Sequence, residues 1–187
     1  MARNIGEGSF VCDSVELVGP YPITIGSSCA IGPNASIRAT GGPIKIGCNN
    51  VVEERVLIEN PGREETVGQD EAVEMTIGDN NLFQVEAAVR CKTIGSANVF
   101  EVKSAIGPDS VVENGCVVGI SVALGSDETL ESGTVVFRAD TLDPPVQRRK
   151  SPNLEVEHSL IASKYCSLLL DPANKCALVQ EHKPKSF

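Results

Sequence analysis

The sequence predicts an all-β solenoid, a parallel β-helix of about seven triangular coils with one C-terminal α-helix packed on the rod. Three observations support this fold class. Apolar residues recur every six positions, and turn-forming residues recur at a fixed place within each six. The interruptions of the six-residue period all fall at one corner of the predicted coil. Such hexapeptide periodicity is typical of a parallel β-helix.

The six-residue period is clearest in the second half of the repeat. Eight consecutive positions there are apolar: Ile94, Phe100, Ile106, Val112, Val118, Leu124, Leu130 and Val136. Because 41% of the chain is hydrophobic, such a run would arise by chance roughly once in a thousand tries per phase. The same spacing upstream links Ile5, Val11 and Leu17, then Ile25, Ile31 and Ile37, then Ile46, Val52 and Ile58, then Ile77, Phe83 and Val89.

The fourth position of each hexapeptide predicts a tight corner. It holds Gly8, Asn34, Asn49, Asn80, Asp109, Gly115, Asp127 and Gly133. These residue types tolerate a left-handed backbone conformation. Short strands joined by such corners wind into a triangular coil of about 18 residues. The spacing resembles the left-handed β-helix of hexapeptide-repeat proteins, and that resemblance implies a left-handed coil.

Each apolar position can be assigned to one side of the triangle. The first side takes Ile5, Ile25, Ile46, Ile77, Ile94, Val112 and Leu130, the second begins at Val11, and the third begins at Leu17. Every departure from six residues then falls after the third side, as between Leu17 and Ile25. Interruptions confined to one corner are typical of loops on one edge of a solenoid.

Stacking of the coils about 4.8 Å apart places equivalent residues in columns. Asn50, Asn81 and Asn98 share an inward position on the first side, where amides hydrogen-bond along the stack. Phe83 and Phe100 share the inward position of the second side. Two outward columns hold Arg38, Glu59 and Arg90 on the third side, and Glu53, Gln84 and Glu101 on the second. We expect all of these columns to be structural.

The chain divides into a β-helix at 1–140, a linker at 141–152, a C-terminal helix at 153–171 and a tail at 172–187. An acidic loop interrupts the β-helix at 60–75, with Glu64, Glu65, Asp70, Glu71 and Glu74 against one Arg63. This loop is either a solvated segment or a docking element for a basic partner. The linker, LDPPVQRRKSP, contains three prolines and a basic cluster, so we expect no regular structure in it.

An amphipathic helix is predicted from Asn153, as its N-cap, to about Leu170. Leu154, Ile161, Tyr165 and Leu168 share one stripe at helical spacing, joined by Leu169. The pair Asp171-Pro172 ends the helix. We expect the stripe to cover a flat side of the rod, with a partner subunit as the alternative.

Composition argues against several classes of partner. The net charge is −9, which disfavours nucleic acid and anionic membranes. No segment is long and apolar enough to span a membrane, and none resembles a signal peptide. The seven cysteines are odd in number and form no C-x-x-C pair, so we expect a reduced intracellular protein. Cys29 and Cys116 occupy small inward positions.

Catalytic and metal-binding residues are not evident on the predicted coils. The two histidines, His158 and His182, both lie beyond the repeat. The γ-class carbonic anhydrases of the hexapeptide-repeat group bind zinc through three histidines, and the acyltransferases typically use a coil-borne histidine as general base. We therefore expect no catalytic residue, metal or cofactor. The alternative is an acyltransferase-like enzyme that acts as a homotrimer with an unconventional base.

Three longer segments carry a more specific resemblance: GPIKIGCNNVVEE, MTIGDNNLFQVEAAV and IGSANVFEVKSAIGPDSVVENGCVVG. They resemble the dynactin subunit 6 family, roughly over 23–140, although the early coil reads VELVGPYPI where many relatives carry Arg-Gly-Asp. The resemblance implies a non-catalytic structural subunit of the dynactin pointed-end complex. It implies as partners dynactin subunit 5 as a sister β-helix, the actin-related protein at the pointed end, and dynactin subunit 4. It also implies a role in dynein-driven microtubule transport and cargo-adaptor engagement, in the cytoplasm and on the cytoskeleton.

Overall fold

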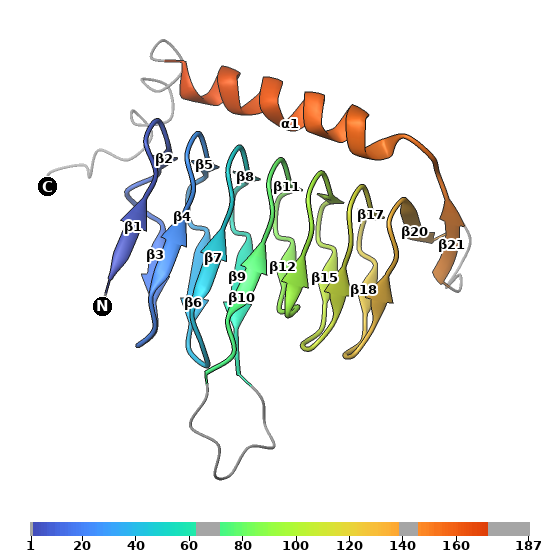
Figure 1. The fold of residues 1–187 in the computed structure, drawn as a ribbon, viewed down its shortest axis with the longest axis horizontal. Coiled ribbons are helices and arrows are strands. Elements are labelled where there is room, and N and C mark those ends of the chain that lie inside the picture. The colour runs from blue at the N-terminus through green and yellow to red at the C-terminus, as the bar shows by residue number, and fades with distance from the viewer. Residues whose placement is uncertain (1, 63–71, 139–145, 172–187) are drawn as a thin grey trace, which may run out of the picture.

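The chain forms a parallel β-solenoid with a single helix lying along it, as the computed structural model describes for residues 2–62, 72–138 and 146–171 (Figure 1). Three parallel sheets form the sides of the rod. The first side holds β1 (Arg3–Ile5), β4 (Ile23–Ile25), β7 (Ile44–Ile46), β10 (Met75–Ile77), β13 (Thr93–Ile94), β16 (Val111–Val112) and β19 (Thr129–Leu130).

The other two sides complete each coil. The second holds β2 (Phe10–Val11), β5 (Ala30–Ile31), β8 (Val51–Val52), β11 (Leu82–Phe83), β14 (Val99–Phe100), β17 (Val117–Val118) and β20 (Thr134–Arg138). The third holds β3 (Glu16–Val18), β6 (Ser36–Ala39), β9 (Leu57–Asn60), β12 (Ala88–Val89), β15 (Ala105–Ile106) and β18 (Ala123–Leu124). In the described part of the chain, β1 to β18 make six complete coils, and β19 and β20 begin a seventh.

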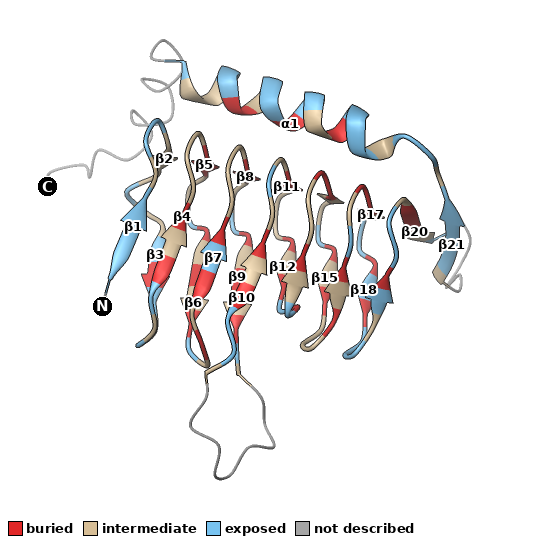
Figure 2. Ribbon diagram, in the orientation of Figure 1, coloured by how far each residue is buried: buried red, intermediate tan, exposed pale blue. Residues whose placement is uncertain are grey.

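Strand register confirms the six-residue frame. Ile94 pairs with Val112, and Val112 pairs with Leu130, in adjacent parallel strands. The second side aligns Phe83 with Phe100 in the same way. These inward side chains form one continuous core, and Figure 2 shows buried residues along every side of the rod. Full burial of such a side chain contributes about 1.5–3 kcal/mol, so the repeated apolar position is the main source of stability.

The predicted corners adopt a left-handed backbone at all eight positions, from Gly8 to Gly133. Six further corners do so with residues that the sequence did not indicate: Ser28, Arg55, Glu86, Ala97, Lys103 and Ser121. A left-handed conformation costs such residues about 1–2 kcal/mol. The stacked coils impose it, because each corner must superpose on its neighbours. Glu86 also forms ion pairs to Arg55 at 3.5 Å and to Lys103 at 3.7 Å.

The linker contains a strand, so the expectation of irregular structure in 142–152 is wrong for β21 (Val146–Lys150). β21 pairs antiparallel with β20. Without it, β20 would present an open edge at the end of the second side, and an open edge leaves backbone groups unpaired. Pro144 and Pro145 precede this strand in the sequence and Pro152 follows it, so no proline interrupts the strand. Val146 packs against the core of the rod.

The C-terminal helix, α1 (Leu154–Leu170), has the predicted bounds, lacks the predicted side-chain cap and docks with only part of the predicted stripe. Asn153 has a φ of 70° and its side chain makes no capping hydrogen bond. The buried positions are His158, Ala162 and Cys166. Of the predicted stripe, Tyr165 and Leu169 pack on the rod, whereas Ile161 and Leu168 are about half exposed. Apolar residues occur around the whole helix, so the sequence pattern alone could not identify the face that docks.

Some predictions lie outside the described residues. These are Arg63, Glu64, Glu65, Asp70 and Glu71 of the acidic loop, and the tail at 172–187. No helix in the described ranges is both long enough and apolar enough to cross a membrane.

Candidate interaction surfaces

The asparagine column lies inside the rod along the first side. Asn50, Asn81 and Asn98 are fully buried. The backbone N–H and the Nδ2 of Asn81 donate to Oδ1 of Asn50 at 2.9 and 3.0 Å, and the backbone N–H of Asn98 donates to Oδ1 of Asn81 at 2.9 Å. Each amide therefore satisfies a backbone donor of the next coil. This arrangement holds coils together and presents no group to solvent.

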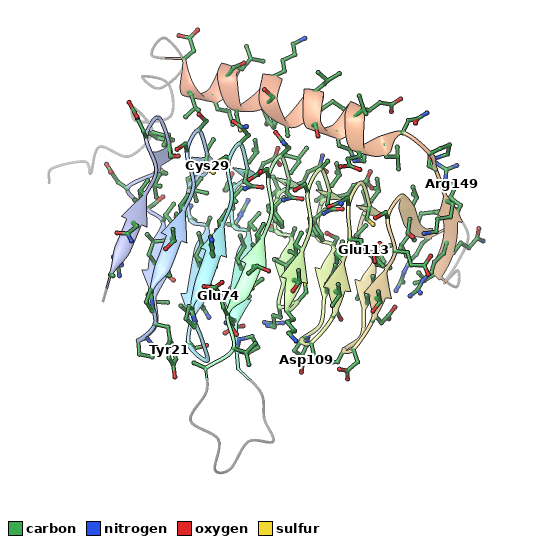
Figure 3. The ribbon with its side chains drawn as sticks, viewed as in Figure 1. Tyr21, Cys29, Glu74, Asp109, Glu113 and Arg149 are labelled. Carbon is green, nitrogen blue, oxygen red and sulfur yellow. The ribbon has the colours of Figure 1, made fainter. Side chains whose placement is uncertain are left out.

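Two buried cysteines extend the same column. The backbone N–H of Cys116 donates to Oδ1 of Asn98 at 2.7 Å. The Cys29 thiol donates to the carbonyl of Gly47 at 3.1 Å, on the side of the rod that faces α1 (Figure 3). Burial raises the pKa of both thiols, which disfavours the nucleophilic thiolate. These cysteines are therefore packing residues.

The side chains of the outward charged columns form ion pairs and hydrogen bonds with neighbouring coils. Arg90 Nε donates to Glu59 Oε2 at 2.7 Å, whereas Arg38 pairs with Glu16, at 3.8 Å, and not with Glu59. On the second side, Glu101 accepts a hydrogen bond from the backbone N–H of Ile120 at 2.9 Å. Such exposed ion pairs contribute about 0–1 kcal/mol each, so this surface is a solvated structural face.

The basic cluster of β21 is paired within the rod. Arg148 pairs with Glu128, and Lys150 Nζ lies 3.0 Å from Glu131 Oε2. Arg149 projects from β21 (Figure 3), and its guanidinium lies 5.6 Å from the ring centroid of Phe137. Two of the three basic side chains of the cluster are therefore paired with glutamates of the rod.

The first interaction surface is the seat of α1, a stripe of outward apolar residues on the second side: Ala30, Val51, Leu82 and Val99. Cys166 packs on Val51 and Leu82. The six-residue period alone does not predict this seat, although the sequence contains a second signal for it. The residue before each inward position is apolar on the second side of these coils, and a strand apolar on both faces is covered on both faces.

Two polar contacts fix the direction of α1 on its seat. Nδ1 of the buried His158 lies 2.9 Å from the carbonyl oxygen of Ala97. The Tyr165 hydroxyl donates to Oε1 of Glu53 at 3.0 Å, and Glu53 also accepts from the backbone N–H of Val85. Burial and the Glu53 carboxylate raise the pKa of Tyr165. The helix consequently runs from the end that carries β21 back toward the first coils (Figure 1).

The second interaction surface is the open end, formed by β1, β2 and β3. Each of these is the last strand of its sheet. Ile5 is 49% exposed, whereas Ile25 and Ile46 in the same column are 1% exposed. At the opposite end, Leu130 and Val136 are buried. The core is therefore buried at the end where β21 covers β20, and partly exposed at the other end, at Ile5 and the half-buried Val11.

No group of three or more His, Cys, Asp or Glu side chains that could hold a metal ion occurs among the described residues. His158, the one histidine in the described ranges, lies on α1 with a ring nitrogen bonded to the rod.

No family model matches the sequence. Individual proteins do. Dynactin subunit 6 of Nematostella vectensis is 40% identical over 135 residues, which are 71% of this chain and 72% of that protein. Dynactin subunit 6 of Xenopus tropicalis is 33% identical over 151 residues, 79% of this chain and 74% of that protein.

A solved structure of a hexapeptide transferase family protein from Anaplasma phagocytophilum superposes with a TM-score of 0.60. The match covers 94% of this chain and 93% of that one at 15% identity, so the likeness is one of fold. The sequence identity to the dynactin subunits extends over most of both chains. On this evidence the chain belongs to the dynactin subunit 6 family.

Proposed function

We propose that this chain is a non-catalytic structural subunit of the dynactin pointed-end complex. The observation that carries the proposal is the 40% identity to a dynactin subunit 6 over 71% of the chain. The geometry supports it in two ways: the described coils carry no histidine, and the open end presents strand edges and apolar residues together.

The open end fits a second β-helix. β1, β2 and β3 offer three parallel strand edges arranged as a triangle. A terminal coil of the same shape can pair with all three edges at a spacing of about 4.8 Å and cover Ile5. Dynactin subunit 5, as the sister β-helix, is the partner we assign to this end.

The wider role belongs to the same proposal and is supported by the family relationship alone. The complex would include the actin-related protein at the pointed end and dynactin subunit 4. Through it, the chain would support dynein-driven microtubule transport and the engagement of cargo adaptors, in the cytoplasm and on the cytoskeleton.

The alternative is an acyltransferase-like enzyme acting as a homotrimer. The similarity in fold to a hexapeptide transferase family protein favours it. At 15% identity, however, that similarity supports a shared fold and not a shared activity. An enzyme of this kind also requires a general base. His158, which lies on α1, is buried with a ring nitrogen against the carbonyl oxygen of Ala97 on the rod. This alternative predicts a trimer that binds coenzyme A saturably.

Co-expression of the full chain with dynactin subunit 5 tests the proposal by gel filtration and light scattering. We expect a one-to-one complex, and we expect Ile5→Asp to abolish it without lowering the melting temperature. Ile120→Asp is the matched control, because Ile120 is 63% exposed at a corner away from the open end. A homotrimer that binds coenzyme A, with no complex, would overturn the proposal.

A further inference from the structure

The N-terminal half of α1 lies against the last complete coils of the rod. In the sixth coil (β16 to β18), a Cβ added to Gly115 would lie 3.0 Å from the backbone nitrogen of Glu155, so a side chain at Gly115 would push the start of the helix away. In the fifth coil (β13 to β15), the carbonyl oxygen of Ala97 lies 2.9 Å from Nδ1 of His158. Ala97 and Gly115 are equivalent corners of adjacent coils, because the strands that follow them pair in register. The three residues from Glu155 to His158 rise about 4.5 Å, which matches the spacing of adjacent coils.

The C-terminal half of α1 continues over the coils toward the open end (Figure 1). Cys166 packs on Leu82 of the fourth coil (β10 to β12) and on Val51 of the third coil (β7 to β9). The Tyr165 hydroxyl donates to Glu53, which also belongs to the third coil. The helix also contacts β5, in the second coil (β4 to β6). It therefore touches five consecutive coils, from the sixth to the second.

The helix is held at both ends of this contact. Just before α1, the backbone N–H of Ser151 donates to the carbonyl oxygen of Gly133 at 2.8 Å, and β21 before it pairs with β20. Toward the other end, Glu53 accepts hydrogen bonds from the Tyr165 hydroxyl and from the backbone N–H of Val85, both at 3.0 Å. Because Val85 belongs to the fourth coil and Glu53 to the third, this carboxylate joins the helix to two coils at once.

The sheets by themselves join only neighbouring coils. Each strand from β1 to β19 pairs with strands of the adjacent coils. In a solenoid of this kind a coil near the end can open by itself, because it loses only its own contacts and those to its neighbours. A helix docked on five coils changes this, since its internal hydrogen bonds make it one rigid unit. The second coil then cannot open without breaking contacts to a helix that the fifth and sixth coils also hold.

We propose that α1 is a strap that couples the second coil to the middle and far coils, and so keeps the strands next to the open end in register. When the helix undocks, the second coil opens more often on all three of its sides, although α1 lies only on the second side. The consequence for partner binding at the open end rests on the proposed function, whereas the coupling between coils does not.

Cys166→Asp tests the strap, because a carboxylate buried between helix and rod is costly and undocks α1 completely. Ser167→Asp is the matched control, since it adds the same charge one residue away at an exposed position. Hydrogen exchange of the full chain is followed by mass spectrometry. In the Cys166→Asp variant, amides of β4 and β6, on the first and third sides, are expected to exchange about tenfold faster. In the Ser167→Asp variant they should keep the wild-type rate, and amides of β13 and β15 should keep theirs in both.

Faster exchange confined to α1 and β5 would overturn the proposal, because the helix would then be only a local cover. Equal changes in the two variants would overturn it as well. Tyr165→Phe is a second, milder test that leaves the core and the net charge unchanged. Loss of its hydrogen bond to Glu53 should raise exchange in β4 and β6 about threefold. If Cys166→Asp unfolds the rod, as circular dichroism would show, the rate in Tyr165→Phe decides, and an unchanged rate there would refute the strap.

Titration with dynactin subunit 5 separates the two proposals. The Cys166→Asp variant should bind about tenfold more weakly than the wild-type chain, because its open end is less well ordered before binding, and Ser167→Asp should bind equally. If the wild-type chain does not bind, the proposed function fails, and the exchange rates still decide the strap. Equal binding by all three chains would overturn the effect of the strap on the open end.

Discussion

At the scale of single residues, the stacking of Phe83 on Phe100 has the largest expected effect on stability. Their rings are nearly parallel, with an interplanar angle of 4° and centroids 4.8 Å apart. That separation matches the spacing of adjacent strands, so the solenoid itself sets the distance. Both side chains are fully buried.

Phe100→Ala is expected to lower the free energy of unfolding by about 3–5 kcal/mol, because the loss of a buried ring leaves a cavity that rigid coils cannot close. Denaturant unfolding followed by circular dichroism measures it. Thr129→Ala, at an exposed position of β19, should change stability by less than about 0.5 kcal/mol. Equal effects of the two substitutions would contradict the central place of Phe100 in the core.

A second residue-scale effect concerns pH. Burial raises the pKa of the Cys91 thiol from 9.0 to about 12. Above pH 9.0 this thiol ionises in the unfolded chain while it stays protonated in the fold, so its contribution to stability falls as pH rises. We expect Cys91→Ala to flatten the decline of melting temperature between pH 8 and pH 11, compared with the wild type. An unchanged slope would mean that Cys91 ionises equally in both states.

At the scale of elements, α1 shows how weakly a sequence pattern specifies a docking face. The prediction of a helix ending before Asp171-Pro172 is correct, because helix bounds depend on local signals. The predicted stripe is wrong for Ile161 and Leu168. The rod selects the face: Ala162 and Cys166 are the side chains buried where the helix meets the rod, with Tyr165 and Leu169 packed beside them.

Ala162→Leu is therefore expected to weaken the docking of α1 by about 1–3 kcal/mol through overpacking. Hydrogen exchange should show lower protection of amides in α1 while amides in the core strands keep theirs. Ser163→Leu, one residue away at an exposed position, adds the same bulk and should leave protection unchanged. Loss of protection in both variants would place the docking face elsewhere.

The strand β21 illustrates a second limit of local reasoning. Prolines and a basic cluster favour irregular structure, yet Val146–Lys150 pairs with β20 over its whole length. The pairing depends on an edge that exists only once the coils are stacked. No property of the linker by itself indicates that edge.

At the scale of the whole molecule, each coil of the rod contacts mainly the coils before and after it. The stability of the rod is therefore approximately the sum of the stability of each coil and of each interface between coils, and the terminal coils are the least stable. The first coil has a neighbour on one side only, and Ile5 is half exposed. At the other end β21 pairs with β20 and Val146 packs on the core, while β18 and β19 remain the terminal strands of their sheets.

We expect amides of β1 to β3 to exchange with solvent faster than amides of β13 to β15, as measured by hydrogen exchange and mass spectrometry. Binding of the sister subunit should slow exchange in β1 to β3 specifically. If the subunit instead protects β19 and β21, the assignment of the open end as the docking surface is wrong.

The sequence by itself determined the solenoid, its three sides, its inward columns and the bounds of its helix, because each depends on a pattern repeated along the chain or on a local signal. The tertiary structure alone decided which face of α1 meets the rod, that β21 closes one end, and that Ile5 is left exposed at the other. Each of these depends on which surfaces stay unpaired after the coils have stacked, and that is a property of the assembled rod.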